Sequence, residues 1–520
     1  MKRAIPVWAI LGITACEPQN LDLNSDSGAA LDDVTAISAA FSDTAAFDDI
    51  GSFSDDDTAA DDTAAEPEPA RPDPFAPRTD TTEGLVNTDR DLMAVLEDGR
   101  LQGACDRYAA DPTNRRKELL CGKEMFFYEG FGTEGVPRGL VDILLRSFDD
   151  EVFGEGFEEY GLVPDPTSPD GYPLGMALSH DEQSLVFTCA SCHFAPMADG
   201  RYAVGAPNHN YRYGEHNLAF ALFPIVATWG LTGPVDPLAQ EKLRPLMDAY
   251  WADIGAQAQL VGWMLSMMGE EIPEFSAENQ RHYAEWLPGT MDFFIEPLPI
   301  DDGVHTVSKI QGLWGIPTSQ EVDEAGMDHA MLGCTGNTRS LNNFARAFAS
   351  LGGGHAEAWG PDEVAPLVAY IESLDAPEPP RTDRAAAARG EALFFSQGCI
   401  DCHSGPRGSG LTLYSFEEIG TDDTMRYWMD PEADGTNIPG VDMGEDQVTN
   451  ALKSPRLVGL WAMEHFLHNG AVSSLDDLLC MYGERPASTL DAMGNDGHTY
   501  GCDTLSWQEK EDLIAYLESH

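Results

Sequence analysis

The fold of this 520-residue chain follows from Cys399-Ile400-Asp401-Cys402-His403, and Cys189-Ala190-Ser191-Cys192-His193 is a second copy of the same pattern. Haem is attached covalently at C-x-x-C-H, because the two thiols add to its vinyl groups and the histidine then binds the iron. An isolated C-x-x-C is also compatible with a redox dithiol or half of a zinc site. Two copies behind an export signal favour haem. We therefore expect two haem c groups, held by Cys189, Cys192, Cys399 and Cys402, with His193 and His403 as iron ligands.

The first residues have the features of a bacterial export signal. Two basic residues precede a short apolar segment, Ile5 to Ala15, that is too short to span a bilayer. It ends in Ile13-Thr14-Ala15-Cys16, which resembles a lipobox, so we expect residues 1–15 to be removed and Cys16 to carry lipid. An ordinary cleaved signal is the alternative. The lipid would anchor the chain in the envelope of a Gram-negative-type bacterium, as a periplasmic or surface-exposed protein.

Residues 16–90 are expected to form a disordered acidic tether. The segment is rich in Asp, Ala, Thr, Ser and Pro, and no Lys or Arg lies between Arg3 and Arg71. Such a composition buries too little apolar surface to offset the entropy lost on ordering. The whole chain has 30 Lys plus Arg and 88 Asp plus Glu, a formal net charge of −58, which argues against nucleic acid as a partner. Part of this charge simply solvates the tether.

The rest of the chain contains an internal repeat of four matching pieces. They are residues 122–127 and 390–395, residues 189–193 and 399–403, residues 309–315 and 456–462, and residues 367–373 and 513–519. The closest match pairs Leu367-Val368-Ala369-Tyr370-Ile371-Glu372-Ser373 with Leu513-Ile514-Ala515-Tyr516-Leu517-Glu518-Ser519. The first copy has an insertion, residues 128–184, before its haem motif. Self-similarity of this kind indicates the duplication of one ancestral unit.

The order of the pieces predicts the fold class. Helix, haem motif, loop, helix and C-terminal helix is the order of a cytochrome c domain, and no alternating apolar run predicts a substantial sheet. We expect a mainly α protein with two cytochrome c-type domains, residues 91–376, which include the large insertion, and residues 382–520. The Pro-rich residues 377–381 are the expected linker between them.

Five cysteines remain after haem and lipid have been assigned: Cys105, Cys121, Cys334, Cys480 and Cys502. In an oxidising envelope, proximity in sequence favours two disulfides, Cys105–Cys121 and Cys480–Cys502. Five cysteines cannot pair completely, which leaves Cys334 as the expected free thiol.

The second repeat carries an ordered set of short motifs that resembles the bacterial di-haem cytochrome c peroxidase superfamily. After Cys399–His403 come Ile419-Gly420-Thr421-Asp422, Ser454-Pro455-Arg456-Leu457 and Phe466-Leu467-His468-Asn469-Gly470. The superfamily also contains the di-haem enzymes that mature tryptophan-derived quinone cofactors, and the rubber oxygenases. The likeness covers about Cys105 to His520, and the long first repeat is more similar to the rubber-oxygenase branch.

The resemblance places the sixth ligand of the second haem on the helix expected after Ser474. Met481 and Tyr482 both lie there. Tyr482 shares the apolar face of that helix, whereas Met481 points away from it, so geometry favours Tyr482 and the chemistry of cytochromes c favours Met481. A core tyrosine bonded through its hydroxyl is the alternative for Tyr482. His465 and His468 are the next candidates, more as hydrogen-bond donors than as ligands.

For the first haem the candidates follow the motif directly. His209 comes sixteen residues after His193, close to the offset of the displaceable distal histidine of the peroxidases, and His216 is the alternative ligand. Cleavage of a peroxide also needs a group that moves a proton between the two oxygens, for which His209 and Glu215 are the candidates. A solvated polar loop is the competing interpretation of this segment.

Three functions are compatible with these features. The first is a peroxidase-type oxidoreductase that takes electrons from a small cytochrome or cupredoxin at its second haem and reduces peroxide at its first. The others are a dioxygen-using oxygenase, similar to the rubber oxygenases, and a non-catalytic electron carrier. A structural calcium, which the resemblance implies, is doubtful here because Met463-Glu464-His465 stands where the peroxidases have Thr-x-Pro.

Overall fold

A computed structural model of the chain describes residues 75, 82–132, 136–138, 157–219, 236–242, 244, 277–292, 306–327, 330–351, 358–427, 449–485, 487, 488, 490 and 493–520. All of them belong to one compact unit that runs from Pro74 to His520. The predicted export signal, the lipidation site Cys16 and most of the predicted tether lie outside the described residues. Within the described part, no helix has the length and apolar character needed to cross a membrane.

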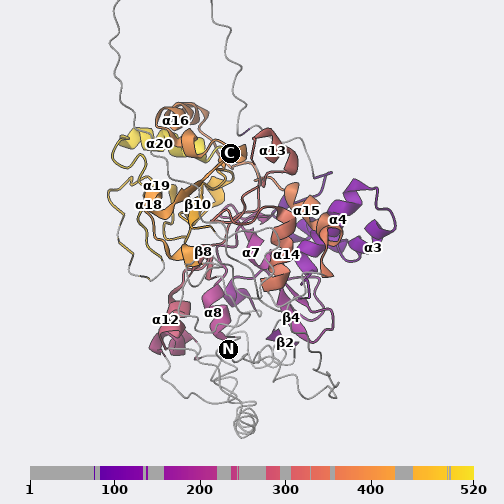
Figure 1. The fold of residues 1–520 in the computed structure, drawn as a ribbon. Coiled ribbons are helices and arrows are strands. Elements are labelled where there is room, and N and C mark those ends of the chain that lie inside the picture. The colour runs from indigo at the N-terminus through magenta and orange to yellow at the C-terminus, as the bar shows by residue number, and fades with distance from the viewer. Residues whose placement is uncertain are drawn as a thin grey trace, which may run out of the picture. The chain divides into compact units, whose positions relative to one another are not determined.

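The helices of the described part are mostly short (Figure 1). They are α2 (Leu92–Val95), α3 (Ala104–Ala109), α4 (Arg115–Tyr128), α7 (Cys189–His193), α8 (Tyr213–Asn217), α12 (Ala277–Glu285), α13 (Ser319–Glu324), α14 (Leu341–Leu351), α15 (Pro361–Glu372), α16 (Arg384–Ser396), α17 (Cys399–Cys402), α18 (Phe416–Ile419), α19 (Leu475–Leu478) and α20 (Trp507–Leu517). Short 3-10 turns lie between them, at Glu97–Gly99, Phe157–Tyr160, Pro406–Gly408, Thr424–Tyr427 and Leu460–Ala462.

Small antiparallel sheets join the loops of the described residues. One has the order β1 (Thr88–Asp89), β6 (Tyr202–Val204), β5 (Phe194–Pro196), and another β2 (Val136–Pro137), β4 (Ser184–Phe187), β3 (Met176–Leu178). Two further pairs are β7 (Thr290–Asp292) with β8 (Val307–Lys309), and β9 (Leu413–Ser415) with β10 (Ala451–Lys453). Each strand has only two to four residues, too few for the alternating pattern by which strands are recognised in a sequence.

In each half of the repeat the first helix crosses the last helix at a glycine. A Cβ atom on Gly122 of α4 would lie 2.0 Å from the Pro366 carbonyl oxygen of α15. A Cβ atom on Gly390 of α16 would lie 2.0 Å from the Asp512 carbonyl oxygen of α20. Only glycine allows the two backbones to approach this closely. The first and fourth pieces of the sequence repeat therefore meet in the same way in both halves.

The two copies of the third piece contact each other across the halves. Arg456 donates from Nε to the Trp314 carbonyl oxygen at 3.0 Å and from Nη2 to the Gly312 carbonyl oxygen at 2.8 Å. The fully buried Trp314 ring packs on Gly459 and donates from Nε1 to the Val204 carbonyl oxygen at 2.8 Å. The two expected domains are therefore halves of one compact unit, and the predicted linker at 377–381 does not separate two bodies.

The folded part begins earlier than the sequence predicts. Residues 82–90, assigned above to the tether, are ordered: β1 pairs with β6, and the buried Lys123 donates from Nζ to the carbonyl oxygens of Val86 at 2.7 Å and Val95 at 2.6 Å. The boundary predicted at residue 90 is therefore wrong, because a lysine far along the chain binds this segment.

The cysteines pair as expected in the described residues. Cys105–Cys121 joins α3 to α4, and Cys480–Cys502 joins the residues after α19 to the loop before α20, which confirms both predicted disulfides. Cys334 is the free cysteine of the described part outside the two haem motifs.

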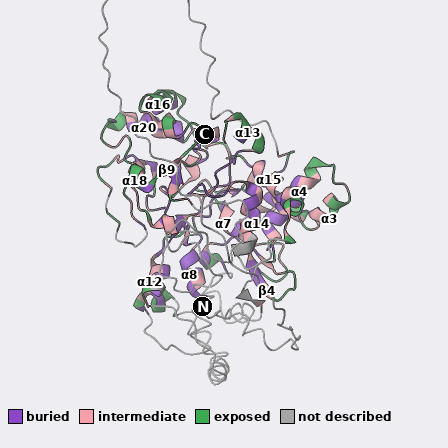
Figure 2. Cartoon of the chain, viewed as in Figure 1, coloured by how far each residue is buried: buried purple, intermediate pink, exposed green. Residues whose placement is uncertain are grey.

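Buried residues gather where the helices of each half face one another (Figure 2). In the first half the core contains Phe126, Phe127 and Tyr370, from α4 and α15. In the second half Phe394 of α16 packs with Tyr516 of α20. The second motif follows α16 directly in the chain. The first motif comes after the insertion and is brought back to α4, where the Thr188 hydroxyl donates to the Phe127 carbonyl oxygen at 2.9 Å.

Candidate functional site

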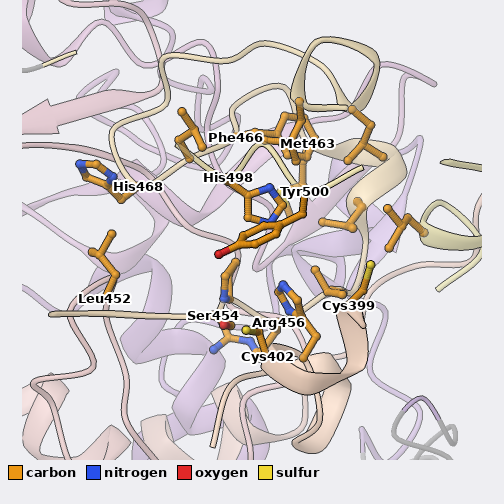
Figure 3. Close-up of a pocket in the computed structure, with 18 of the residues that line it drawn as sticks. Cys399, Cys402, Leu452, Ser454, Arg456, Met463, Phe466, His468, His498 and Tyr500 are labelled. Carbon is orange, nitrogen blue, oxygen red and sulfur yellow. The ribbon is translucent and has the colours of Figure 1, made fainter. Parts of the chain in front are cut away.

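A cavity of about 300 Å³ lies beside the second C-x-x-C-H motif (Figure 3). Cys399, Cys402 and His403 all line it, which brings the three predicted haem-binding side chains of this motif to one space. α17 follows α16 after a two-residue break in which Gly398 has φ +79°, a left-handed turn that glycine adopts without strain. Much of the remaining wall is apolar, from Phe394, Leu452, Leu457, Phe466, Leu475, Leu479, Leu513 and Leu517.

His403 is held as a neutral imidazole with one nitrogen available. Its Nδ1 lies 2.7 Å from the carbonyl oxygen of Gly408, so Nδ1 carries the proton and donates, and Nε2 keeps a lone pair. Burial lowers the pKa of His403, and the backbone of Gly408 and Pro455 opposes this shift. A ligand histidine is commonly oriented in this way, by a hydrogen bond from its other nitrogen.

Three cationic side chains, Lys309, Lys453 and Arg456, also line the cavity. Burial lowers the pKa of Lys453 to about 7 and lowers that of Lys309 as well. In the part of the chain that the structure describes, neither ammonium forms an ion pair with a carboxylate. An uncompensated cation inside a protein is costly, so the cavity favours an anionic group. The two carboxylates of a haem would compensate this charge, and the thiols, the imidazole and the apolar wall fit the rest of that group.

Three further histidines, His465, His468 and His498, line the same cavity. His468 is 8% exposed, and its Nε2 has no hydrogen-bond partner among the described residues. His498 lies over the middle of the cavity with Tyr500, whereas His468 lies at the end near Leu452 (Figure 3). Burial lowers the pKa of His498 to about 4, with the charge of His403 as the next cause, and both rings line the cavity.

His498 is the site residue that the sequence analysis missed. It lies between Gly497 and Gly501 in the loop before α20, where a lone histidine in a glycine-containing turn gives little sequence signal. The disulfide Cys480–Cys502 links this loop to the residues that follow α19.

Tyr482 and Met481, the predicted sixth ligands of the second haem, do not line the cavity. α19 begins at the predicted N-cap Ser474 but ends at Leu478, and Cys480 has a left-handed φ of +52°. Tyr482 is therefore not on a continuous helix face. It is 76% exposed and donates from its hydroxyl to Asp476 at 3.2 Å. The helix-face argument for Tyr482 is wrong because the helix stops after one turn.

The first motif forms α7, between β4 and β5. Gly205 donates its N–H to the His193 carbonyl oxygen, and Asn208 donates to that of Cys192, both at 2.8 Å. Burial raises the pKa of Cys189 to about 12 and that of Cys192 to about 11, and lowers that of His193 to about 4. The motif therefore lies in an apolar interior in which all three side chains are neutral.

The two predicted distal histidines of the first haem have different surroundings. His209 lies where the halves meet: its Nε2 accepts the Glu464 N–H at 3.1 Å, and its ring is 5.2 Å from that of His465. His216 is fully buried, and its Nδ1 lies 3.0 Å from the Tyr211 hydroxyl. Its ring centroid lies 4.9 Å from that of Tyr160, in the apolar cluster that Cys192 packs against, and 5.3 Å from that of Phe187, which packs against the same cluster. Of the two, the structure brings His216 into the cluster beside the first motif.

Glu215 does not join that cluster. Its carboxylate pairs with Lys242 at 2.6 Å and with Arg212 at 3.7 Å. The predicted acid–base role of Glu215 stays a prediction. No group of three or more His, Cys, Asp or Glu with the geometry of a metal site occurs among the described residues.

Comparisons with known proteins add little. No family model matches the sequence, and no curated protein matches it. Among solved structures, hydrazine synthase of Kuenenia stuttgartiensis, in a structure pressurised with 20 bar xenon, has 17% identity and a TM-score of 0.27. The match covers 46% of this chain and 79% of that one. A likeness at this TM-score carries no argument about the fold or the function.

Proposed function

We propose that this chain is an envelope-anchored di-haem c-type cytochrome and a peroxidase-type oxidoreductase. The observation that carries the proposal is the cavity beside the second motif. It combines two thiols, an imidazole with a fixed tautomer, an apolar wall and two lysines, Lys309 and Lys453, that form no ion pair with a carboxylate of the described residues. The equivalent helix crossings at Gly122 and Gly390 support two related cytochrome c-type halves.

When bound, each haem would supply an iron that accepts and donates single electrons. Cys399 and Cys402 would hold the second haem and His403 would bind its iron, while Lys309 and Lys453 would compensate its carboxylates. Cys189, Cys192 and His193 would do the same for the first haem. Buried apolar side chains pack beside both motifs.

The two halves are suited to different roles. The second cavity contains three histidines besides His403, and a site with imidazoles on both sides of the iron favours electron transfer over binding of an external ligand. The first motif has the hydrogen-bonded pair Tyr211–His216 in its cluster, which can hold and move a proton. We therefore propose that electrons enter at the second haem and that peroxide is reduced at the first.

A second candidate is a non-catalytic electron carrier. The same histidine-rich cavity favours it if the first iron is also bound on both sides, by His193 and His216. The net charge of −58 favours a basic partner in either case, such as a small basic cytochrome or cupredoxin.

Haem content tests the proposal directly. A pyridine haemochrome assay should give two haems per chain for the wild type and one each for C399A/C402A and C189A/C192A. The matched control is C334A, which removes a free thiol that lines the same cavity but belongs to neither motif, and it should keep two haems. Two haems in C399A/C402A would refute the assignment of the second site.

Function and location need separate measurements. Turnover of hydrogen peroxide with a reduced small cytochrome is expected, whereas a purely low-spin protein that binds neither carbon monoxide nor peroxide would favour the carrier.

C16A should move the protein from the membrane fraction to the soluble envelope fraction. Retention of C16A in the membrane fraction would contradict the lipid anchor.

A further inference from the structure

An ion pair joins the first half of the chain to the turn beside His403. Arg407 Nη2 lies 2.6 Å from Glu321 Oε1, and the two side chains are only 11% and 22% exposed. Glu321 belongs to α13, within the first copy of the repeat, and Arg407 belongs to the turn that follows the second haem motif. At this exposure, solvent screens the attraction less than it screens a surface pair.

Arg407 controls the position of the atom that orients His403. The next residue, Gly408, supplies the carbonyl oxygen that accepts the His403 Nδ1 proton. Arg407 itself has φ +56° and ψ +32°, a left-handed conformation that costs free energy for any residue with a side chain. Its carbonyl oxygen also accepts the Leu457 N–H at 2.8 Å. The turn keeps this conformation because Arg407 is held at both its side chain and its backbone.

The carboxylate of Glu321 has two separate tasks. Its Oε2 accepts the Thr318 N–H at 2.9 Å, which completes the capping box at the start of α13. Its Oε1 is left for Arg407. A glutamine at this position can still complete a capping box, so the charge and the cap can be separated by substitution.

We propose that Glu321 is a positioning residue for the second haem and that, through Arg407 and the Gly408 carbonyl, it lowers the reduction potential of that haem. This inference rests on the proposed function. A firm hydrogen bond at Nδ1 makes His403 a stronger donor to iron and so favours the oxidised state. The Glu321 carboxylate also neutralises the Arg407 cation, which would otherwise favour the reduced state.

The test is a spectroscopic redox titration of the full-length protein with both haems bound. E321Q keeps the capping box and removes the charge, so one of the two midpoint potentials should rise and the other should stay. The controls are E324Q, which removes an exposed charge from the same helix, and T318A, which weakens the cap and keeps the ion pair. Neither should move a potential. E321D should restore much of the wild-type value, because it keeps the carboxylate.

Each outcome decides the inference. An E321Q protein with two haems and unchanged potentials would overturn it and leave the proposed function standing, as would an equal shift in E324Q. A wild-type chain with fewer than two haems would overturn the proposed function and this inference with it. If E321Q does not fold, R407K takes its place. It keeps the cation but loses the planar guanidinium, and it should raise the same potential, whereas an unchanged potential would overturn the inference.

Discussion

At the scale of single residues, the sequence predicts which side chains would bind haem. It does not predict the hydrogen bonds that orient those side chains. The pentapeptides mark His193 and His403 as the expected haem ligands, because haem attachment requires two thiols and an imidazole at a fixed spacing. The partner of His403 Nδ1 is a backbone carbonyl in a turn whose preceding residue, Arg407, is left-handed. Nothing in the residue types predicts that conformation, since it depends on Glu321, far away in the sequence.

The ligand opposite His403 is the first prediction at this scale. Y482F should leave the absorption spectrum of the oxidised and reduced protein unchanged, because Tyr482 is exposed and bonded to Asp476. H498A should change the spectrum of the second haem, because His498 lines the same cavity as His403. Equal spectral changes in the two variants would show that the loop after α19 rearranges around the haem.

The buried Lys123 gives a prediction about pH. Its pKa falls from the ordinary 10.5 to about 7, mainly through burial, with Glu97 opposing the shift. The unfolded chain therefore binds more protons between these values, and this residue makes the free energy of unfolding rise from pH 7 towards pH 10. In K123M that contribution should be absent.

The control for this prediction is K117M, a change at an exposed lysine of the same helix, α4, which pairs with Asp111. Denaturant unfolding at pH 7, 8 and 9 measures the effect. K117M should keep the wild-type slope of stability against pH, and K123M should have a flatter one. If K123M has a slope as steep as that of the wild type, a group other than Lys123 causes the pH dependence of stability.

At the scale of elements, the start of a helix is better encoded than its end. Ser506 and Glu509 form a capping box at the start of α20, a pattern that is readable in the sequence, and the predicted Ser474 begins α19. The apolar spacing predicts that α19 continues to Tyr482, but it stops at Leu478 because the chain turns into the Cys480–Cys502 disulfide region. Local periodicity does not report such tertiary constraints, and strands of two to four residues give no periodicity at all.

The helix crossings predict the effect of one methyl group. In an exposed helix, Gly→Ala stabilises by about 1 kcal/mol. G390A should do the opposite and cost about 1–3 kcal/mol or more, because the added carbon would overlap the Asp512 carbonyl and force α16 and α20 apart. G122A should behave alike in the first half. Thermal or denaturant unfolding checks both, with S396A at the exposed end of α16 as the control, and a stabilised G390A would contradict the crossing.

At the scale of the whole molecule, the repeat in the sequence predicts two halves but not how tightly they join. Matching pieces identify the ancestral unit, because duplicated residues remain similar. The contacts between Arg456 and the Trp314 segment join copies of the same piece, and each copy alone appears complete in the sequence. The sequence therefore leads to two domains with a linker, whereas the described residues form one compact unit.

Because the two halves contact each other closely, we predict one cooperative unfolding transition for the described unit. Far-ultraviolet circular dichroism and the haem Soret band should report the same midpoint, because the fully buried Trp314 packs on Gly459 and cannot be exposed without opening both halves. Differential scanning calorimetry should show a single peak for the described unit. Two separate peaks, each with its own Soret change, would mean that the halves unfold independently.

The contact between Trp314 and Gly459 also constrains how such a chain can evolve. Both copies of the third piece carry Gly-Leu-Trp, at residues 312–314 and 459–461, and the structure packs the ring of the first copy on the glycine of the second. Neither copy can therefore be exchanged for a foreign cytochrome module that lacks its member of the pair. Recombination within this lineage should therefore conserve the pair as a unit, and chimaeras built at residues 377–381 should become soluble only when the incoming half also provides a glycine at position 459.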